Sequence, residues 1–151
     1  MTPEDKELLL KDLCARLPYG VKAKITEEGV LSYDSGIGVI VGKEHVDNEI
    51  FILQCKNDSW CLTAISEFVP YLRPMSSMTE EEKKEWVSLR TDVEKYYRIG
   101  HDAVVDFYNK HHFDYRGLIE IGLALEAPEN MYKHFGDMDV VVNSVEHKDK
   151  L

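Results

Sequence analysis

The residues that could do chemistry in this sequence gather in one stretch, which runs from His111 to Arg116. His112 and Asp114 are two residues apart, a spacing that would let them share a metal ion or act as an acid–base pair. The stretch follows one predicted helix and begins another, so backbone N–H groups and the fork of Arg116 could bind an anion. The structural interpretation is that His111 complements a helix C-terminus and Asp114 caps the next helix. We favour it because the set of ligands is incomplete.

A second candidate site comprises Tyr71 and Arg73, which precede the point where the hydrophobic period of the sequence changes. Around residues 74–79 the period lengthens from about 2 to about 3.6, which indicates strands followed by helices. Pockets favour such seams, and an aromatic side chain beside an arginine suits a protein or small-ligand contact. Packing of the linker onto both halves is the interpretation that we favour for these residues.

Motifs that would name a reaction are missing from the sequence. Gly36, Gly38 and Gly42 lack the spacing of a dinucleotide or phosphate loop, and no G-x-S-x-G, H-E-x-x-H or C-x-x-C occurs. We therefore predict no catalytic residue, no metal site and no cofactor. Cys55 and Cys61 flank an expected hairpin turn and could face each other as a disulfide or half a metal site, although two core thiols are the favoured interpretation.

The composition indicates an acidic globular protein. Of 151 residues, 44% are apolar, and the formal net charge of −10 is spread along the chain. A diffuse negative field disfavours binding to nucleic acid or anionic membranes, although Lys22 and Lys24 share one strand face. No apolar run reaches the roughly 20 residues of a membrane span. The acidic N-terminus is unlike a secretory signal, so we expect a cytoplasmic location, with the oligomeric state open.

The first half of the chain predicts a helix and a set of short strands. Residues 2–16 suit a helix that Thr2 caps and whose apolar stripe contains Leu9 and Leu13. Residues 66–72 are expected to form a short turn or 3₁₀ piece. The expected strands cover residues 21–25, 30–33, 37–41, 49–55 and 59–65.

The second half predicts helices. Thr79 and Glu82 form a capping box, and the helix behind them should run to about Arg98 with Trp86 and Leu89 facing the sheet, together with Val93 and Tyr97. Gly100 is expected to interrupt it. Further elements are expected as helices at about 101–110 and 115–125, a turn at 129–135 and an edge strand at 140–142.

These elements predict an α+β protein with one compact domain overall. Residues 1–18 form an N-terminal helix, residues 19–78 a small antiparallel β-sheet or SH3-like barrel, and residues 79–135 a helical lobe packed on it. The sequence does not separate the sheet from the barrel. Residues 136–151 form a poorly patterned tail.

Three stretches carry a resemblance to a known family. They read LCARLPYGV (residues 13–21), PYLRPMSSMTEEE (70–82) and HHFDYRGLI (111–119), and the last continues as GLALEAP (122–128). In these stretches the chain resembles a family of small uncharacterised proteins from gut bacteria and their phages or integrated elements. The resemblance implies a bacterial or phage cytosolic setting. It carries no activity, cofactor or site residue with it.

Three functions follow as expectations. The leading one is a non-enzymatic protein-interaction module of phage or mobile-element type, because the surface is acidic and no catalytic set is complete. The first alternative is a small-molecule or nucleotide binder or hydrolase that uses residues 111–116 with Arg73. The second is a protein that contacts or mimics nucleic acid.

Overall fold

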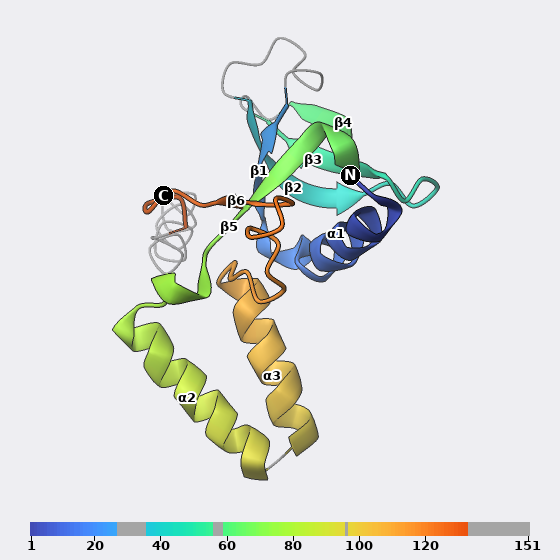
Figure 1. Ribbon diagram of the computed structural model, residues 1–151. Coiled ribbons are helices and arrows are strands. Elements are labelled where there is room, and N and C mark those ends of the chain that lie inside the picture. Colours follow the sequence, from blue (N-terminus) through green and yellow to red (C-terminus); the bar gives the residue numbers. More distant parts are fainter. Residues whose placement is uncertain (27–35, 56–58, 96, 133–151) are drawn as a thin grey trace, which may run out of the picture.

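The computed structural model describes residues 1–26, 36–55, 59–95 and 97–132 and has an α+β architecture (Figure 1). An N-terminal helix packs on a curved sheet, and two longer helices project together from one end of it. Among the described residues, the short 3₁₀ turns η1 (Leu17–Tyr19), η3 (Ile65–Glu67) and η4 (Met75–Ser77) link the elements. In chain order the helices and strands are α1 (Pro3–Ala15), β1 (Lys22–Ile25), β2 (Ile37–Lys43), β3 (Ile50–Gln54), β4 (Trp60–Ala64), β5 (Phe68–Leu72), α2 (Glu80–Lys95), α3 (Tyr97–Lys110) and β6 (Leu125–Glu126).

Helix α1 forms where local signals place it. The Thr2 hydroxyl accepts the N–H of Asp5 at 3.1 Å, and the Asp5 carboxylate accepts the N–H of Thr2 at 3.4 Å, which completes a capping box. Leu9 and Leu13 lie one turn apart and are buried in the main core against the sheet. The predicted N-terminal helix is thus confirmed.

Within the described ranges the sheet has six strands in the order β4-β3-β2-β1-β5-β6, and all pairs except β5–β6 are antiparallel. Because β5 returns to lie beside β1, the sheet is not a plain meander. Phe51 of β3 and Phe68 of β5 meet edge to face at 5.6 Å although two strands separate them in the sheet. This contact requires strong curvature, as in a small, partly open barrel. The parallel β6 is an addition that the sequence did not indicate.

The prediction for residues 66–72 is wrong beyond Glu67, because Phe68–Leu72 is the strand β5. The N–H of Thr26 donates to the carbonyl of Glu67, so by the antiparallel alternation Pro70 sits at a position that makes no hydrogen bond to β1. Its missing N–H faces the other side, where the pairing with β6 begins only at Tyr71. A proline is therefore tolerated inside this strand.

Helix α2 begins as predicted, but the break between the two long helices comes earlier in the chain than expected. The Thr79 hydroxyl accepts the N–H of Glu82, and a Glu82 carboxylate oxygen accepts the N–H of Thr79, so this capping box is confirmed. Helix α2 ends at Lys95 and α3 already runs from residue 97 through Gly100, so the predicted break at Gly100 is wrong.

The packing of α2 also differs from the expectation. Trp86 and Leu89 pack in a second apolar cluster with Phe107 of α3 and with Phe113, and the Trp86 indole N–H donates to the Tyr108 hydroxyl at 2.9 Å. The expectation that they face the sheet is therefore wrong. Val93 and Tyr97 have side chains outside the described part of the structure.

The predicted helix at 115–125 is replaced by turns. Gly117 and Gly122 adopt φ angles of 73° and 82°, in the left-handed region that interrupts a right-handed helix. Leu118 and Leu123 are still buried in the main core, and the chain then pairs as β6. Residues 129–132 form the predicted turn as far as the structure describes it. The predicted strands at 30–33 and 140–142 and the tail at 136–151 lie outside the described residues.

Candidate functional site

The polar residues of the 111–116 stretch are distributed among separate partners. Asp114 uses its carboxylate on the backbone, where it accepts the N–H groups of Leu118 at 2.8 Å and Ile119 at 2.9 Å. These bonds satisfy amide groups at the start of the following turn, in the way a helix cap does. The carboxylate thus stabilises a turn that brings Leu118 into the core.

Arg116 belongs to a buried ionic cluster on α1 that includes Asp12 and Arg16. The Asp12 carboxylate accepts two hydrogen bonds from Arg16, at 2.8 and 3.1 Å, and one from Arg116 at 3.1 Å. Arg16 also donates to the carbonyl of Phe113 at 2.7 Å, and both guanidinium groups lie over the Tyr115 ring. The side chains of Asp12 and Arg16 are 0% exposed. This cluster ties the 113–116 segment to α1.

Arg73 and His111 meet on Glu82, at the junction of β5 with the two long helices. Arg73 binds the Glu82 carboxylate through two hydrogen bonds of 2.8 Å, and the Nδ1 atom of His111 lies 3.2 Å from it. Burial opposes ionisation of Glu82, but the bonds from Arg73, His111 and the Thr79 N–H hold its pKa well below its usual range. The Arg73 guanidinium also lies 4.3 Å from the centre of the Phe113 ring. Glu82 is thus an ionised anchor.

His112 is buried and stacked on Tyr132, with ring centroids 3.8 Å apart. Burial, reinforced by the charges of Arg16 and Arg73, lowers the pKa of His112 to about 3, so the imidazole is neutral at pH 7. Its φ of 64° places the backbone in the left-handed region at the end of α3. Tyr71, the last of the six candidate residues, also contacts Tyr132: its backbone carbonyl accepts a hydrogen bond from the Tyr132 hydroxyl at 3.0 Å.

The six sequence-predicted residues therefore share a neighbourhood but not a common target. Arg73 and His111 come together on Glu82, Tyr71 and His112 both contact Tyr132, and Asp114 and Arg116 have other partners. These interactions join elements of the fold: the end of β5 to α2, the end of α3 to α2, and the turn segment both to α1 and to the end of β5. In the described part of the chain no group of three or more His, Cys, Asp or Glu residues could hold a metal ion.

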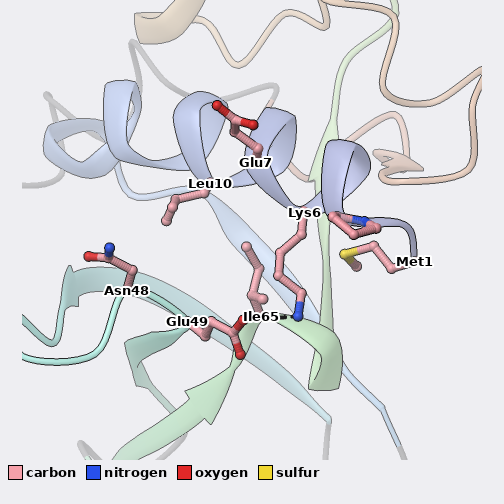
Figure 2. Close-up of a pocket in the computed structure, with 8 residues that line it drawn as sticks. Met1, Lys6, Glu7, Leu10, Asn48, Glu49 and Ile65 are labelled. Carbon is pink, nitrogen blue, oxygen red and sulfur yellow. Dashed lines mark hydrogen bonds and ion pairs between the residues drawn. The ribbon is translucent and has the colours of Figure 1, made fainter.

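A surface pocket of about 370 Å³ lies elsewhere, beside the first turns of α1 (Figure 2). Lys6 and Glu49 form an ion pair of 2.9 Å across it, and Leu10 and Ile65 supply apolar walls. None of the six candidate residues lines this pocket. The other residues around it are Met1, Pro3, Glu7 and Asn48.

The edge strand β4 carries a feature that the sequence analysis did not single out. Its outward side chains, Trp60 and Leu62, are 62% and 69% exposed, whereas Cys61 and Thr63 point into the core. Leu62 lies opposite Ile52 of β3, which is half-buried, so the apolar surface continues onto the next strand. The alternation of Trp60 and Leu62 was readable, but the sequence does not tell which face of the strand is solvated.

The backbone of β4 is open along the same residues. Cys55 donates its N–H to the carbonyl of Ser59, and Ile65 donates to Glu49, so odd-numbered residues of β4 carry the hydrogen bonds to β3. The N–H and C=O groups of Trp60, Leu62 and Ala64 consequently point away from β3. Within the described ranges β4 pairs with β3 alone.

Comparisons with known proteins identify no relative of this chain. No family model matches the chain, and no curated protein or solved structure matches it either. Among the helices that the structure describes, none has the length and apolar character needed to cross a bilayer.

Proposed function

We propose that this protein is a non-enzymatic protein-interaction module that binds an extended segment of a partner protein along the edge strand β4. The observation that carries the proposal is the coincidence, on Trp60 and Leu62, of exposed apolar side chains and of backbone groups that face an edge where the described residues place no other strand. Strand addition uses both features, because main-chain hydrogen bonds supply affinity and alternate side chains supply specificity.

The composition of β4 supports this interpretation. Edge strands are usually protected by lysine, proline, a bulge or a covering element, because an open edge recruits other strands. The strand reads Trp-Cys-Leu-Thr-Ala and contains no charge and no proline. Each added backbone hydrogen bond contributes about 0.5–1.5 kcal/mol net to the free energy of binding. Pairing the N–H and C=O groups of three residues therefore favours binding. Burial of Trp60 and Leu62 adds to it.

The partner segment can be described by its chemistry. It is an extended stretch of about five residues whose alternate side chains are apolar and lie beside Trp60 and Leu62. The formal net charge of −10 favours basic residues on either side of that stretch, because complementary charge accelerates association. A bacterial cytoplasm and a phage or mobile-element origin belong to the same proposal and rest on the resemblance of residues 13–21, 70–82 and 111–119.

The test compares Leu62→Lys with a matched control, Val46→Lys. Val46 is 81% exposed and lies in the connection between β2 and β3, so both changes place one lysine at an exposed apolar position. A third variant, Leu62→Pro, removes the N–H that points to the open edge and leaves the bonds to β3 in place. Each tagged protein is used to capture partners from a bacterial lysate, and bound complexes are then examined by hydrogen exchange.

The expected result is a partner retained by the wild type and Val46→Lys but lost with both Leu62 variants. In that complex the amides of Trp60, Leu62 and Ala64 become protected from exchange. A partner that binds all four proteins equally, or the absence of any partner specific to the intact edge, would count against the proposal. Sedimentation of the purified protein tests whether a second copy of this chain occupies β4. A dimer that Leu62→Lys breaks would show that it does, and would overturn the proposal of a different partner.

A further inference from the structure

Two thiols face each other at the end of the β3–β4 hairpin. Cys55 follows β3 directly and Cys61 lies in β4, with both side chains buried on the inward face of the sheet. Their sulfur atoms are 3.1 Å apart, within the distance of an S–H···S hydrogen bond. They are diagonal neighbours in the ladder, because Cys61 lies opposite Leu53 and the N–H of Cys55 bonds to Ser59.

We propose that Cys55 and Cys61 form a reversible redox site that closes to a disulfide in exchange with small-molecule disulfides such as oxidised glutathione. The sulfur atoms need to approach by only about 1 Å to reach the bonded distance of roughly 2.05 Å. Both cysteines are free thiols in the structure. The inference stands apart from the proposed partner binding, since it depends only on the geometry of the pair.

The exchange balances in two steps. One thiol of the pair loses its proton to solvent, and its thiolate attacks a sulfur of the small disulfide, so that a mixed disulfide forms and one small thiolate leaves. The second thiol is then deprotonated and attacks the protein sulfur of the mixed disulfide. This forms the Cys55–Cys61 bond and expels the second small thiolate. The protein loses two protons and two electrons, the small disulfide takes up the two electrons and becomes two thiolates, and the released protons reach them through solvent to give two thiols.

The surroundings set the rate at which the pair reacts. Burial, together with the hydrogen bond between Cys55 and Cys61, raises the pKa of Cys55 to about 11, so this thiol is protonated at neutral pH. Because the thiolate is the reacting form, the exchange is expected to be slow near pH 7 and faster as the pH rises. The pair is thus stable in a reducing compartment and closes when small disulfides persist. Closure links β3 covalently to the strand that carries Trp60 and Leu62.

The equilibrium can be worked from the size of the ring. A disulfide between residues 55 and 61 closes a loop of seven residues. Closing a loop of that length lowers the conformational entropy of the unfolded chain, whereas the folded hairpin has already lost that entropy. The chain-entropy relation then predicts that the equilibrium constant for closure is about 50-fold larger in the folded protein than in the unfolded one.

The experiment equilibrates the full chain with reduced and oxidised glutathione, once in buffer and once in urea, and traps the thiols with acid and an alkylating reagent. Trypsin cleaves after Lys56, between the two cysteines, so the two peptides stay joined only if the disulfide is present. The wild type is compared with Cys14→Ser, which removes the third thiol, and with Cys55→Ala, which removes one partner.

The result expected is a joined peptide pair in the wild type and in Cys14→Ser, with closure favoured in the folded state by about the predicted 50-fold. Cys55→Ala should instead accumulate a glutathione adduct on Cys61. The proposal is overturned if the folded protein carries glutathione on Cys55 or Cys61 without joining them. It is equally overturned if closure is no more favourable when folded than in urea, since the hairpin would then resist the bond.

Discussion

The buried ionic cluster of α1 makes a quantitative prediction about folding stability. Replacing Asp12 by asparagine keeps the shape of the side chain but removes the charge that faces Arg16 and Arg116. In the wild type the carboxylate accepts three hydrogen bonds of 2.8–3.1 Å from these two guanidinium groups, and Asp12 and Arg16 are fully buried. An amide oxygen can retain some of these bonds but cannot neutralise either cation.

The magnitude follows from the cost of leaving a buried charge without its partner. Removing one member of a buried pair destabilises a protein by about 3–5 kcal/mol. Arg116 is partly exposed and can turn toward water, whereas Arg16 cannot, because its side chain is fully buried and also holds the Phe113 carbonyl. We therefore expect Asp12→Asn to lower the free energy of unfolding by about 3 kcal/mol, a fall in melting temperature of roughly 10 °C.

Urea unfolding followed by tryptophan fluorescence measures this change, since Trp60 and Trp86 report on the sheet and on α2. The matched control is Glu7→Gln on the exposed face of the same helix, which should change stability by less than about 0.5 kcal/mol. A double variant, Asp12→Leu with Arg16→Met, replaces the pair by apolar groups and should lose less than Asp12→Asn alone. A loss below about 1 kcal/mol for Asp12→Asn, or a double variant less stable than the single one, would refute the assignment of the cluster as a buried anchor.

Four further predictions test other parts of the structure. Because the pKa of His112 falls from 6.5 to about 3 on folding, its contribution is complete above pH 6.5 and is lost as the pH falls toward 3. Between about pH 7.5 and pH 5 the wild type should lose roughly 2 kcal/mol more than His112→Phe in urea titrations. Glu82→Gln should cost about 2 kcal/mol in the same assay at pH 7, because it removes the charged partner of Arg73. Gly117→Ala should cost about 1 kcal/mol in thermal unfolding, since φ is 73° although a Cβ has open space there. The oxidised form with the Cys55–Cys61 bond should have a free energy of unfolding in urea about 2 kcal/mol larger than that of the reduced form. Equal urea midpoints for the two forms would contradict the effect expected from ring closure.

The parts of the fold that sequence could predict are those with local causes. Thr2 and Thr79 each precede an acidic residue at the third helical position, and both capping boxes form. The alternation along Lys22–Ile25 and the dense apolar run of Ile50–Gln54 gave strands at the expected places. In each case neighbouring residues alone determine the conformation.

The failures have non-local causes. Pro70 argued against a strand, and it is accommodated only because its missing N–H faces a side where no ladder has yet begun. Leu118, Ile119 and Leu123 have helical spacing, but the left-handed glycine at position 122 and the Asp114 side chain shape the segment into turns. In the same way, Asp12 and Arg16 are a legible i, i+4 pair, whereas the third member of their cluster, Arg116, lies 104 positions from Asp12.

Phe113 explains why so many polar residues of the 111–116 stretch have structural partners. Its carbonyl accepts a hydrogen bond from Arg16, its ring lies beneath Arg73, and its backbone forms a parallel bridge with Arg73. The ionic cluster on α1 and the Glu82 anchor of the long helices therefore meet at one residue. Charged groups at this junction hold helices and sheet together, so their substitution should be read first as a change in stability.

The junction around Phe113 and the exposed edge of β4 can be distinguished by experiment. Changes at the junction are expected to lower stability and, through it, any activity, whereas changes at Trp60 or Leu62 remove exposed side chains whose loss leaves the core intact. Of these two regions, only the exposed edge is therefore expected to change binding without changing unfolding. Since β4 contributes its inward residues to the core and its outward residues to solvent, one strand serves both purposes, and its two faces can be varied independently.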